Sequence, residues 1–196
     1  MSAQAAPFAP HAVFLVGFMG AGKSSVGRVL ARRLNWLFED LDDLIERRER
    51  RSIAEIFRDA GEFDFRKAEH DALLQVLETL SGKPGRVVAL GGGAFAQAKN
   101  AALLKRHGMQ VVFLDAPLEV LWERCCKQAS EMGTERPLLQ SMNQFRDLYQ
   151  ARRKSYSRAA LTVQTGARDF EEIAAEIAEW LELKKLNLRA ETGEVD

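Results

Sequence analysis

The residues GFMGAGKS, at positions 17–24, decide the fold of this chain. They match G-x-x-x-x-G-K-[ST], a pattern whose backbone N–H groups surround a phosphate chain. The apolar run 12–16 before the motif predicts a buried strand, and the helical spacing of Val26, Leu30 and Leu34 after it predicts a helix. This order places a helix N-terminus against a phosphate. The alternative, a turn whose glycines serve only the backbone, is less favoured because the lysine and serine are also in register.

The motif predicts a nucleotide site in which two side chains have separate tasks. Lys23 is expected to reach the β- and γ-phosphates, and the Ser24 hydroxyl is expected to ligate Mg²⁺. The predicted nucleotide-binding residues of this loop are Gly20, Ala21, Gly22, Lys23, Ser24 and Ser25.

The composition indicates one α/β domain without a global charge. The length of 196 residues suits a single domain with a sizeable core. Lys plus Arg and Asp plus Glu are both 28, so no net field attracts nucleic acid or a membrane surface. No stretch approaches the roughly 20 apolar residues of a membrane span. An anionic substrate must therefore be held by a local group of cations.

Cysteine and histidine usage suits a cytoplasmic protein without a disulfide framework. Cys125 and Cys126 are sequence neighbours and are the only cysteines, which fits a reducing cytosol. His11, His70 and His107 lack metal-ligand spacing to one another or to the cysteines. We therefore expect these residues to be packed or solvated, and not to bind a metal.

The sequence predicts a single domain over residues 12–183. Residues 1–11 are expected to form a disordered lead-in, since they lack the basic start and apolar block of a signal peptide. Residues 184–196 lose apolar periodicity and are expected to form a loose tail. Five apolar runs are predicted to be strands, at 12–16, 36–38, 86–90, 110–115 and 161–163.

Helical patterns separate these strands. Ser52 and Glu55 form a capping box that opens a short helix ending near Gly61, with Phe57 facing inward. The stripe that begins at Phe170 is assigned to core packing. The other helices are predicted at 44–51, from 65 onward, at 96–104, at 118–127 and at 145–156.

Carboxylates follow the second strand. In an extended segment, Asp40 and Asp42 point to one side and Asp43 to the other. Ligands bind at the carboxyl ends of parallel strands, so one of the pair is expected to hold Mg²⁺ through water and the other to meet a substrate hydroxyl. The open alternative is that they form the first turn of the next helix, where they stabilise its dipole.

Glycines follow the third strand. Gly91, Gly92 and Gly93 permit close backbone approach to a ligand, which we favour over a flexible turn because the phosphate loop ends at the same sheet edge. Further along, Arg66 and Glu69 share a helix face, and as an exposed pair they would contribute only a few tenths of a kcal/mol.

Asp115 ends the fourth strand and is similar to the magnesium-binding aspartate of phosphate-loop proteins. It competes with Asp40 for that role. Because Pro117 follows closely, we prefer a helix N-cap for Asp115. The polar segment that ends at Arg136 fits a lid that closes over the transferred phosphoryl group, with an ordinary surface loop as the alternative.

Together these segments resemble the shikimate kinases. The phosphate loop alone occurs in many unrelated enzymes, whereas the combined set of segments is far more specific. They lie in family order over about residues 12–170, and they are Gly17–Ser25, Asp40-Leu41-Asp42, Arg51–Phe57, Gly61-Glu62, Phe65-Arg66 with Glu69, Gly91–Ala94, Arg136–Leu139, and Arg152 four residues before Tyr156.

The resemblance implies a three-layer P-loop kinase fold of the nucleoside-monophosphate-kinase type. This fold has a five-stranded parallel sheet flanked by helices, with substrate-binding helices and a mobile lid at about 127–140. The implied activity is transfer of the γ-phosphoryl group of ATP to the 3-hydroxyl of shikimate, giving shikimate 3-phosphate and ADP for chorismate and aromatic amino acid biosynthesis. The implied protein is a monomer.

The resemblance also assigns residues to roles. Lys23, Asp42 and Arg136 would be catalytic, with Asp42 at the reacting hydroxyl and Arg136 brought down by the lid. Ser24 and Asp40 would hold Mg²⁺, the latter through water, and Arg124 would lie against adenine together with Arg136 near the nucleotide. The residues implied for substrate binding are Asp42, Arg66, Glu69, Gly91, Gly92, Gly93 and Arg152, the last chosen over Arg153 from its spacing to Tyr156.

Two other classes of function remain as alternatives. Another small-molecule kinase of this architecture, such as gluconate or adenylate kinase, would share the phosphate loop but would not need Phe-Arg-x-x-Glu with Gly-Gly-Gly. A non-catalytic nucleotide-binding module would be expected to lose Lys23, Asp42 or Arg136, and all three are present.

Overall fold

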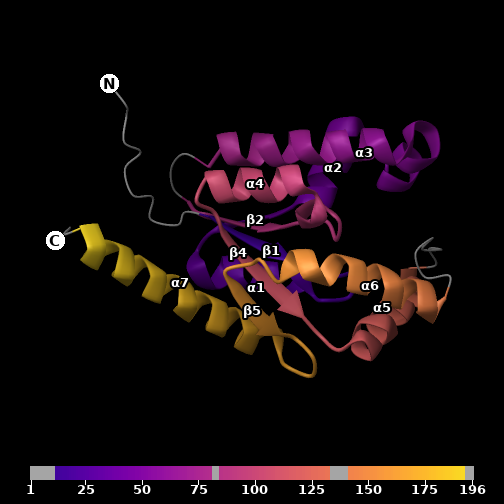
Figure 1. Ribbon diagram of the computed structural model, residues 1–196. Helices are drawn as coiled ribbons and strands as arrows, with labels where there is room; N and C mark the ends of the chain where they lie inside the picture. The colour runs from indigo at the N-terminus through magenta and orange to yellow at the C-terminus, as the bar shows by residue number, and fades with distance from the viewer. Residues whose placement is uncertain (1–11, 81–83, 133–140, 193–196) are drawn as a thin grey trace.

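A five-stranded parallel sheet forms the centre of the computed structural model, which describes residues 12–80, 84–132 and 141–192 (Figure 1). The strand order across the sheet is β2-β3-β1-β4-β5. The predicted α/β fold with five parallel strands is therefore confirmed. The strands are β1 (Ala12–Val16), β2 (Leu37–Asp40), β3 (Arg86–Ala89), β4 (Gln110–Asp115) and β5 (Leu161–Gln164).

Strand β1 lies in the middle of the sheet, which explains its uninterrupted apolar sequence. Phe14 pairs in register with Val88 of β3 on one side and with Val111 of β4 on the other. All of β1 is buried, because helices cover both faces of a parallel sheet. The loop that follows β1 therefore emerges between β3 and β4, at the carboxyl edge of the sheet.

Helices cover both faces of the sheet (Figure 1). Helix α1 (Lys23–Leu34) packs against α7 (Phe170–Thr192), and α3 (Ile53–Glu78) and α4 (Ala98–Arg106) lie on the opposite face. The remaining elements are α2 (Leu41–Glu49), the short 3-10 helix η1 (Ala94–Ala96), α5 (Leu118–Met132) and α6 (Met142–Tyr156).

The predicted capping box and the break at Gly61 are both present in α3. The Ser52 side chain accepts from the Glu55 N–H, and the Glu55 carboxylate accepts from the Ser52 N–H at 2.7 Å. Gly61 has φ 78° and ψ −179°, a conformation that interrupts the helix and that residues with a Cβ rarely adopt. The segment therefore consists of two helical pieces that meet at a glycine.

Two predicted boundaries need correction near the cleft. Helix α2 begins at Leu41, so Asp42 lies in its first turn and not in an extended segment; Asp40 caps this helix by accepting from the Asp42 N–H at 3.1 Å. Helix α5 continues to Met132, so the predicted lid at 127–140 begins as helix. Arg136 and the rest of that lid lie outside the described residues.

The predicted loose tail over 184–196 also needs correction, because α7 continues to Thr192. Lys185 pairs with Glu182 at 2.7 Å, and the Lys184 ammonium lies 5.8 Å from the Trp180 ring centroid. Such local contacts and helix-favouring residues extend a helix without an apolar stripe. Residues 1–11, predicted as a lead-in, and 193–196 lie outside the described residues.

Within the described ranges, no helix is both long and apolar enough to span a bilayer.

We predict that Gly27→Ala destabilises the protein, although Gly→Ala inside a helix ordinarily stabilises it by about 1 kcal/mol. A Cβ on Gly27 would collide with the Phe38 ring of β2 and would lie 3.3 Å from Leu15 Cδ1. Such overpacking costs roughly 1–3 kcal/mol. Urea unfolding measures the change, with Arg33→Ala on the exposed face of the same helix as the control. A Gly27→Ala protein as stable as the wild type would contradict this packing.

Candidate active site

A cleft of about 840 Å³ lies at the carboxyl edge of the sheet. Its lining comes from the phosphate loop, the start of α2, α3, the glycines after β3, and helices α5, α6 and α7. Of the predicted site residues that the structure describes, only Ala21 is not part of this lining, because it is buried beneath the loop. The predicted residues that line the cleft are Gly20, Gly22, Lys23, Ser24, Ser25, Asp40, Asp42, Arg66, Glu69, Gly91, Gly92, Gly93, Arg124 and Arg152.

The phosphate loop folds around its own lysine. Gly22, the N-cap of α1, has φ 88°, which favours glycine at this turn. The Lys23 ammonium donates to the carbonyl oxygens of Gly17 and Phe18, both at 3.0 Å. Burial lowers the pKa of Lys23, and the carboxylates of Asp42 and Asp40 oppose this effect. Lys23 is thus a desolvated cation at the first turn of α1.

Ser24 and Asp40 lie together at the edge of the cleft. The Ser24 hydroxyl donates to Asp40 Oδ2 at 2.6 Å, which joins the phosphate loop to the end of β2. A hydroxyl and a carboxylate are both oxygen donors of the kind that Mg²⁺ prefers. Among the described residues, no group of three or more His, Cys, Asp or Glu side chains forms a metal cage. This donor set therefore fits a magnesium ion that takes most of its ligands from water and phosphate.

Asp42 is a buried carboxylate in the first turn of α2. Burial, with the neighbouring Asp40 as the next cause, raises its pKa to about 7, although Lys23 opposes the shift. A Cβ at Gly91 would lie only 2.5 Å from Asp42 Oδ1, so the strand end and the carboxylate are in close contact. Asp42 belongs to the helix start, as one alternative proposed, and it also lines the cleft, whereas its contact with a substrate hydroxyl stays a prediction.

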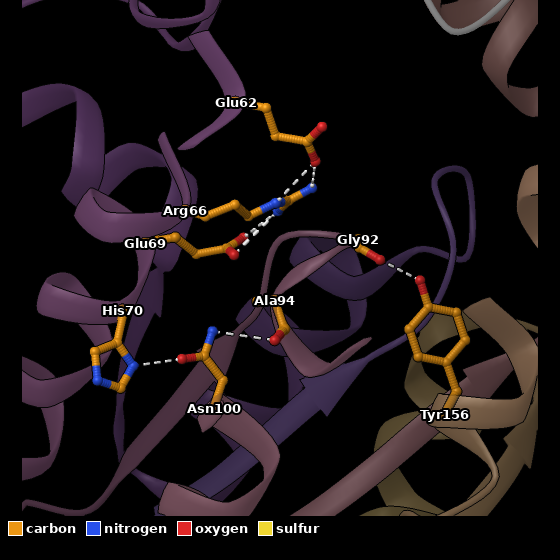
Figure 2. Close-up of polar contacts among 8 residues, drawn as sticks. All are labelled: Glu62, Arg66, Glu69, His70, Gly92, Ala94, Asn100 and Tyr156. Atoms are coloured by element: carbon orange, nitrogen blue, oxygen red, sulfur yellow. Dashed lines mark hydrogen bonds and ion pairs between the residues drawn. The ribbon is translucent and has the colours of Figure 1, made fainter. Parts of the chain in front are cut away.

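Two glutamates hold the guanidinium group of Arg66 (Figure 2). Its Nη1 donates to the Glu69 oxygens at 3.1 and 3.0 Å, and its Nη2 donates to Glu62 Oε1 at 3.2 Å. The Glu69 side chain is 1% exposed and that of Glu62 is 68% exposed. The predicted pairing of Arg66 with Glu69 is present, but the small value given to it applied to an exposed pair, whereas the Glu69 carboxylate is buried and Arg66 is 16% exposed. Burial raises the pKa of Glu69, and Arg66 opposes the shift.

The glycines after β3 have little room for side chains. A Cβ at Gly93 would lie 2.6 Å from the Arg66 guanidinium, and one at Gly92 would lie 3.4 Å from Arg152 Nη1. Arginines from α3 and α6 thus meet at one short stretch of backbone. We conclude that this stretch is tightly surrounded, which favours close approach over a merely flexible turn.

The two neighbouring arginines of α6 have different environments. Arg152 lines the cleft, and its guanidinium lies 5.9 Å from the Phe18 ring centroid in the phosphate loop. Arg153 donates to Asp115 Oδ2 at 2.9 Å, and Tyr149 donates to Asp115 Oδ1 at 3.0 Å. These contacts attach α6 to the end of β4.

The preferred assignment of Asp115 as a helix N-cap was therefore wrong. Its buried carboxylate accepts from the Ala116 N–H at 3.1 Å and otherwise contacts Arg153 and Tyr149 from α6. Helix α5 does not begin until Leu118, too far along the chain for Asp115 to serve its first turn.

One family matches most of the chain. The model of the family described as shikimate kinase matches residues 19–182. The chain belongs to the shikimate kinase family. Within this family, it is 44% identical over 169 residues to the shikimate kinase of Geobacter sulfurreducens, covering 85% of this chain and 88% of that protein. It is 38% identical over 166 residues to the shikimate kinase of Persephonella marina, covering 84% and 95%.

Solved structures of shikimate kinases resemble the whole fold. The shikimate kinase from Acinetobacter baumannii in complex with shikimate has a TM-score of 0.78 and 35% identity, covering 89% of this chain and 94% of that one. A gluconokinase from Sinorhizobium meliloti has a TM-score of 0.62 and 22% identity, covering 93% and 97%. The latter likeness shows a shared fold alone.

Two aromatic residues of this family member line the cleft but were assigned to the core from the sequence. Phe57 is 40% exposed and Phe170 is 37% exposed, and both lie in the cleft wall. A Cβ at Gly22 would lie 3.3 Å from the Phe170 ring, which places Phe170 at the nucleotide end. Phe57 follows Ile53 and Ile56 in α3, and Phe170 begins the apolar stripe of α7, so periodicity alone does not separate either residue from the core.

Arg124 was predicted to lie against adenine, and this role stays a prediction. Its guanidinium donates to the carbonyl oxygens of Gly20 at 3.3 Å and Thr165 at 3.0 Å, and also to that of Gly166. Arg124 thus connects the phosphate loop to the turn after β5 while it lines the nucleotide end of the cleft.

We predict that Asp42→Asn stabilises the protein increasingly as the pH rises from 4 to 8. The folded pKa of Asp42 is about 7 and its ordinary value is 3.8. A carboxyl with a raised pKa therefore costs no stability below about pH 4, the cost grows as the pH rises from about 4 to about 7, and it levels off above the folded pKa. We expect the advantage of the variant to be on the order of a few kcal/mol once the pH exceeds the folded pKa.

Urea unfolding at several pH values measures this difference. Asp43→Asn, at an exposed position in the same helical turn, is the matched control. A stability gap between Asp42→Asn and the wild type that stays level from pH 4.5 to 8.5 would argue against a buried carboxylate with a raised pKa.

Proposed function

We propose that this protein transfers the γ-phosphoryl group of ATP to the 3-hydroxyl of shikimate, giving shikimate 3-phosphate and ADP. One observation carries the proposal: Arg66 and Arg152, from separate helices, meet at Gly92 and Gly93 within the same cleft as the phosphate loop. Two arginines at one point suit a carboxylate, which planar guanidinium groups bind through paired hydrogen bonds. Membership of the shikimate kinase family supports this choice of acid.

At the nucleotide end, the phosphate loop would bind the β- and γ-phosphates. Lys23 is desolvated by burial, so its charge acts in a medium of low dielectric constant. Arg124 and Phe170 line the same end, where a cation and an aromatic ring suit the flat surface of a base. Arg136, which we expect to approach with the lid, would add positive charge at the transferred phosphoryl group.

Ser24 and Asp40 would hold a magnesium ion, the hydroxyl directly and the carboxylate through water. This assignment is supported by their direct contact and by the oxygen character of both groups. The ion would neutralise negative charge on the phosphates of ATP.

Asp42 would orient the attacking hydroxyl of shikimate. As the new bond forms between the 3-oxygen and the γ-phosphorus, the bond from phosphorus to the β–γ bridging oxygen breaks and ADP leaves. The hydroxyl proton passes to the Asp42 carboxylate, whose pKa of about 7 suits a group that accepts a proton near neutrality. Positioning contributes more than deprotonation, because phosphoryl transfer passes through a loose transition state.

At the end of the cleft formed by Arg66, Arg152 and the glycines, here called the acid end, the two arginines would bind the carboxylate of shikimate. The N–H groups of Gly92 and Gly93 would bind oxygens of its ring. Glu69 would hold Arg66 in place, since it contacts Nη1 from a fully buried position. A buried carboxylate behind the arginine limits the rotation of the guanidinium group and leaves less entropy to be lost on binding.

The first test is a coupled assay of ADP release with Mg·ATP, with shikimate, quinate or gluconate as the acceptor. We expect turnover with shikimate and little with gluconate, because the paired arginines and glycine backbone surround a rigid ring acid. ATP binding without ADP release for shikimate would contradict the proposal. Turnover with gluconate instead would favour the alternative small-molecule kinase, and no turnover with any acceptor would favour a binding module.

We predict that Arg152→Ala and Arg153→Ala separate substrate binding from stability. Arg152→Ala is expected to raise the KM for shikimate by about 10- to 100-fold, since a charge-assisted hydrogen bond to the carboxylate contributes roughly 1.5–3 kcal/mol. Arg153→Ala removes a partner of the buried Asp115 and is expected to lower the melting temperature while leaving the KM for shikimate within about 2-fold. Steady-state kinetics and thermal unfolding measure both effects.

Equal rises in KM for the two variants would contradict the assignment of Arg152 as the substrate arginine. The monomeric state and the cytoplasmic location expected from the sequence also stay predictions.

A further inference from the structure

The carbonyl groups of the Gly91–Gly93 stretch are all held by donors from the protein. The Gly91 oxygen accepts from the Ala94 N–H at 3.0 Å, and the Gly93 oxygen accepts from the Ala96 N–H at 3.1 Å. The Gly92 oxygen accepts from the hydroxyl of Tyr156, which reaches it from α6 (Figure 2). The middle carbonyl of the stretch is thus held by a side chain and its two neighbours by backbone.

Fixing a carbonyl also fixes the next N–H group. A peptide unit is planar and trans, so the N–H of residue i+1 points away from the C=O of residue i. The contact to the Gly91 oxygen therefore sets the direction of the Gly92 N–H, and the Tyr156 hydroxyl sets that of the Gly93 N–H. In the part of the chain that the structure describes, neither of these N–H groups donates to an acceptor.

Tyr156 is held firmly enough to act in this way. Its side chain is fully buried, and its ring packs on Phe113 of β4 with centroids 5.2 Å apart. Burial raises the pKa of Tyr156 to about 12, so the hydroxyl keeps its proton at neutral pH and remains a donor. Glycine has more backbone freedom than any other residue, so three in succession need such external restraint.

Asn100 restrains the other end of the stretch (Figure 2). This buried residue of α4 donates from Nδ2 to the Ala94 oxygen at 3.1 Å. Its Oδ1 lies 2.6 Å from His70 Nδ1. Because the Asn100 amide nitrogen must face a carbonyl, its oxygen must accept, and His70 therefore donates. The contact links α3, which carries Arg66 and Glu69, to the residue after Gly93.

We propose that Tyr156 and Asn100 are positioning residues for shikimate: the Tyr156 hydrogen bond to the Gly92 oxygen directs the Gly93 N–H group into the cleft, and the Asn100 hydrogen bond to the Ala94 oxygen holds in place the residue that follows the glycine stretch. The proposal rests on the proposed function and adds to it two residues that need not touch the substrate. According to this proposal, side chains from three helices, α3, α4 and α6, hold the backbone of the glycine stretch in the conformation that binds shikimate.

The alternative is that these hydrogen bonds contribute only to the stability of the core. The two roles differ in what they change. A purely structural bond lowers the free energy of unfolding and leaves the KM values of the folded enzyme unaltered. A positioning bond also weakens the binding of shikimate, whereas ATP, at the other end of the cleft, binds as before.

The test compares Tyr156→Phe with Tyr149→Phe, two deletions of a hydroxyl from the same helix. The Tyr149 hydroxyl donates to Asp115, away from the glycine stretch, so it is a matched control. We expect Tyr156→Phe to raise the KM for shikimate about 3- to 10-fold, as the loss of one hydrogen bond predicts. The KM for ATP should stay within about 2-fold, and Tyr149→Phe should leave both KM values unchanged.

Two further readouts make the test independent of turnover. Calorimetric titration with shikimate should show the same loss of affinity for Tyr156→Phe. In ¹⁵N-labelled protein, the amide resonance of Gly93 should shift in Tyr156→Phe without ligand and should respond less to shikimate. Asn100→Asp keeps the shape of the side chain but replaces its Nδ2 donor by an oxygen. It provides a second variant should Tyr156→Phe fold poorly, and it should also raise the KM for shikimate.

The outcomes separate this inference from the proposed function. Absence of shikimate binding and turnover in the wild type would remove the proposed function and this inference with it. A wild type that turns over shikimate, with Tyr156→Phe and Asn100→Asp unchanged in KM, would overturn the inference alone. Equal rises in KM for Tyr156→Phe and Tyr149→Phe would also overturn it, since they would indicate a general disturbance of α6.

Discussion

Parallel strands place all their carboxyl ends at one edge of the sheet, and the whole cleft depends on this constraint. Strand β1 ends at the phosphate loop, β2 ends at Asp40, and β3 leads into Gly91–Gly93. Strand β4 ends at Asp115, which holds α6, and β5 leads into Thr165, whose carbonyl accepts from Arg124. Segments far apart in the sequence therefore converge without long loops. The chemistry at this edge needs only the side chains that each strand end or following helix adds.

Burial of charge is the second constraint. Lys23, Asp42 and Glu69 are desolvated within one cleft, and each carries a perturbed pKa whose largest cause is burial. Isolated buried charges would cost several kcal/mol each, so the cations and carboxylates must lie close enough to compensate one another. This compensation explains how a chain of zero net charge binds anions. The cleft gathers a local group of cations, among them Lys23 and Arg66, and buried carboxylates lie beside them.

The sequence predicted the parts of this arrangement that depend on local spacing. The phosphate loop, the capping box at Ser52 and the Arg66–Glu69 pair all follow from residues within a few positions of each other, and the sheet follows from apolar runs. Long-range partners were not predictable in this way. Asp115 was assigned to a cap because Pro117 is near it in sequence, whereas its partners lie 34 and 38 residues away on α6. Likewise, Phe170 belongs to a helical stripe, and periodicity does not show that the first residue of a stripe faces a cleft.

The neighbouring arginines of α6 show how one helix serves both stability and binding. Successive residues of a helix are separated by about 100°, so Arg152 and Arg153 cannot face the same way. With Arg153 held by the buried Asp115, Arg152 is directed into the cleft, and Tyr156, one turn beyond Arg152, reaches the Gly92 oxygen. The position of Arg152, which we propose to bind the substrate carboxylate, and the direction of the Gly93 N–H group are therefore set by the same helix. A displacement of α6 would disturb both proposed contacts to shikimate together, which favours a single well-defined geometry at that end of the cleft over independent adjustment of each contact.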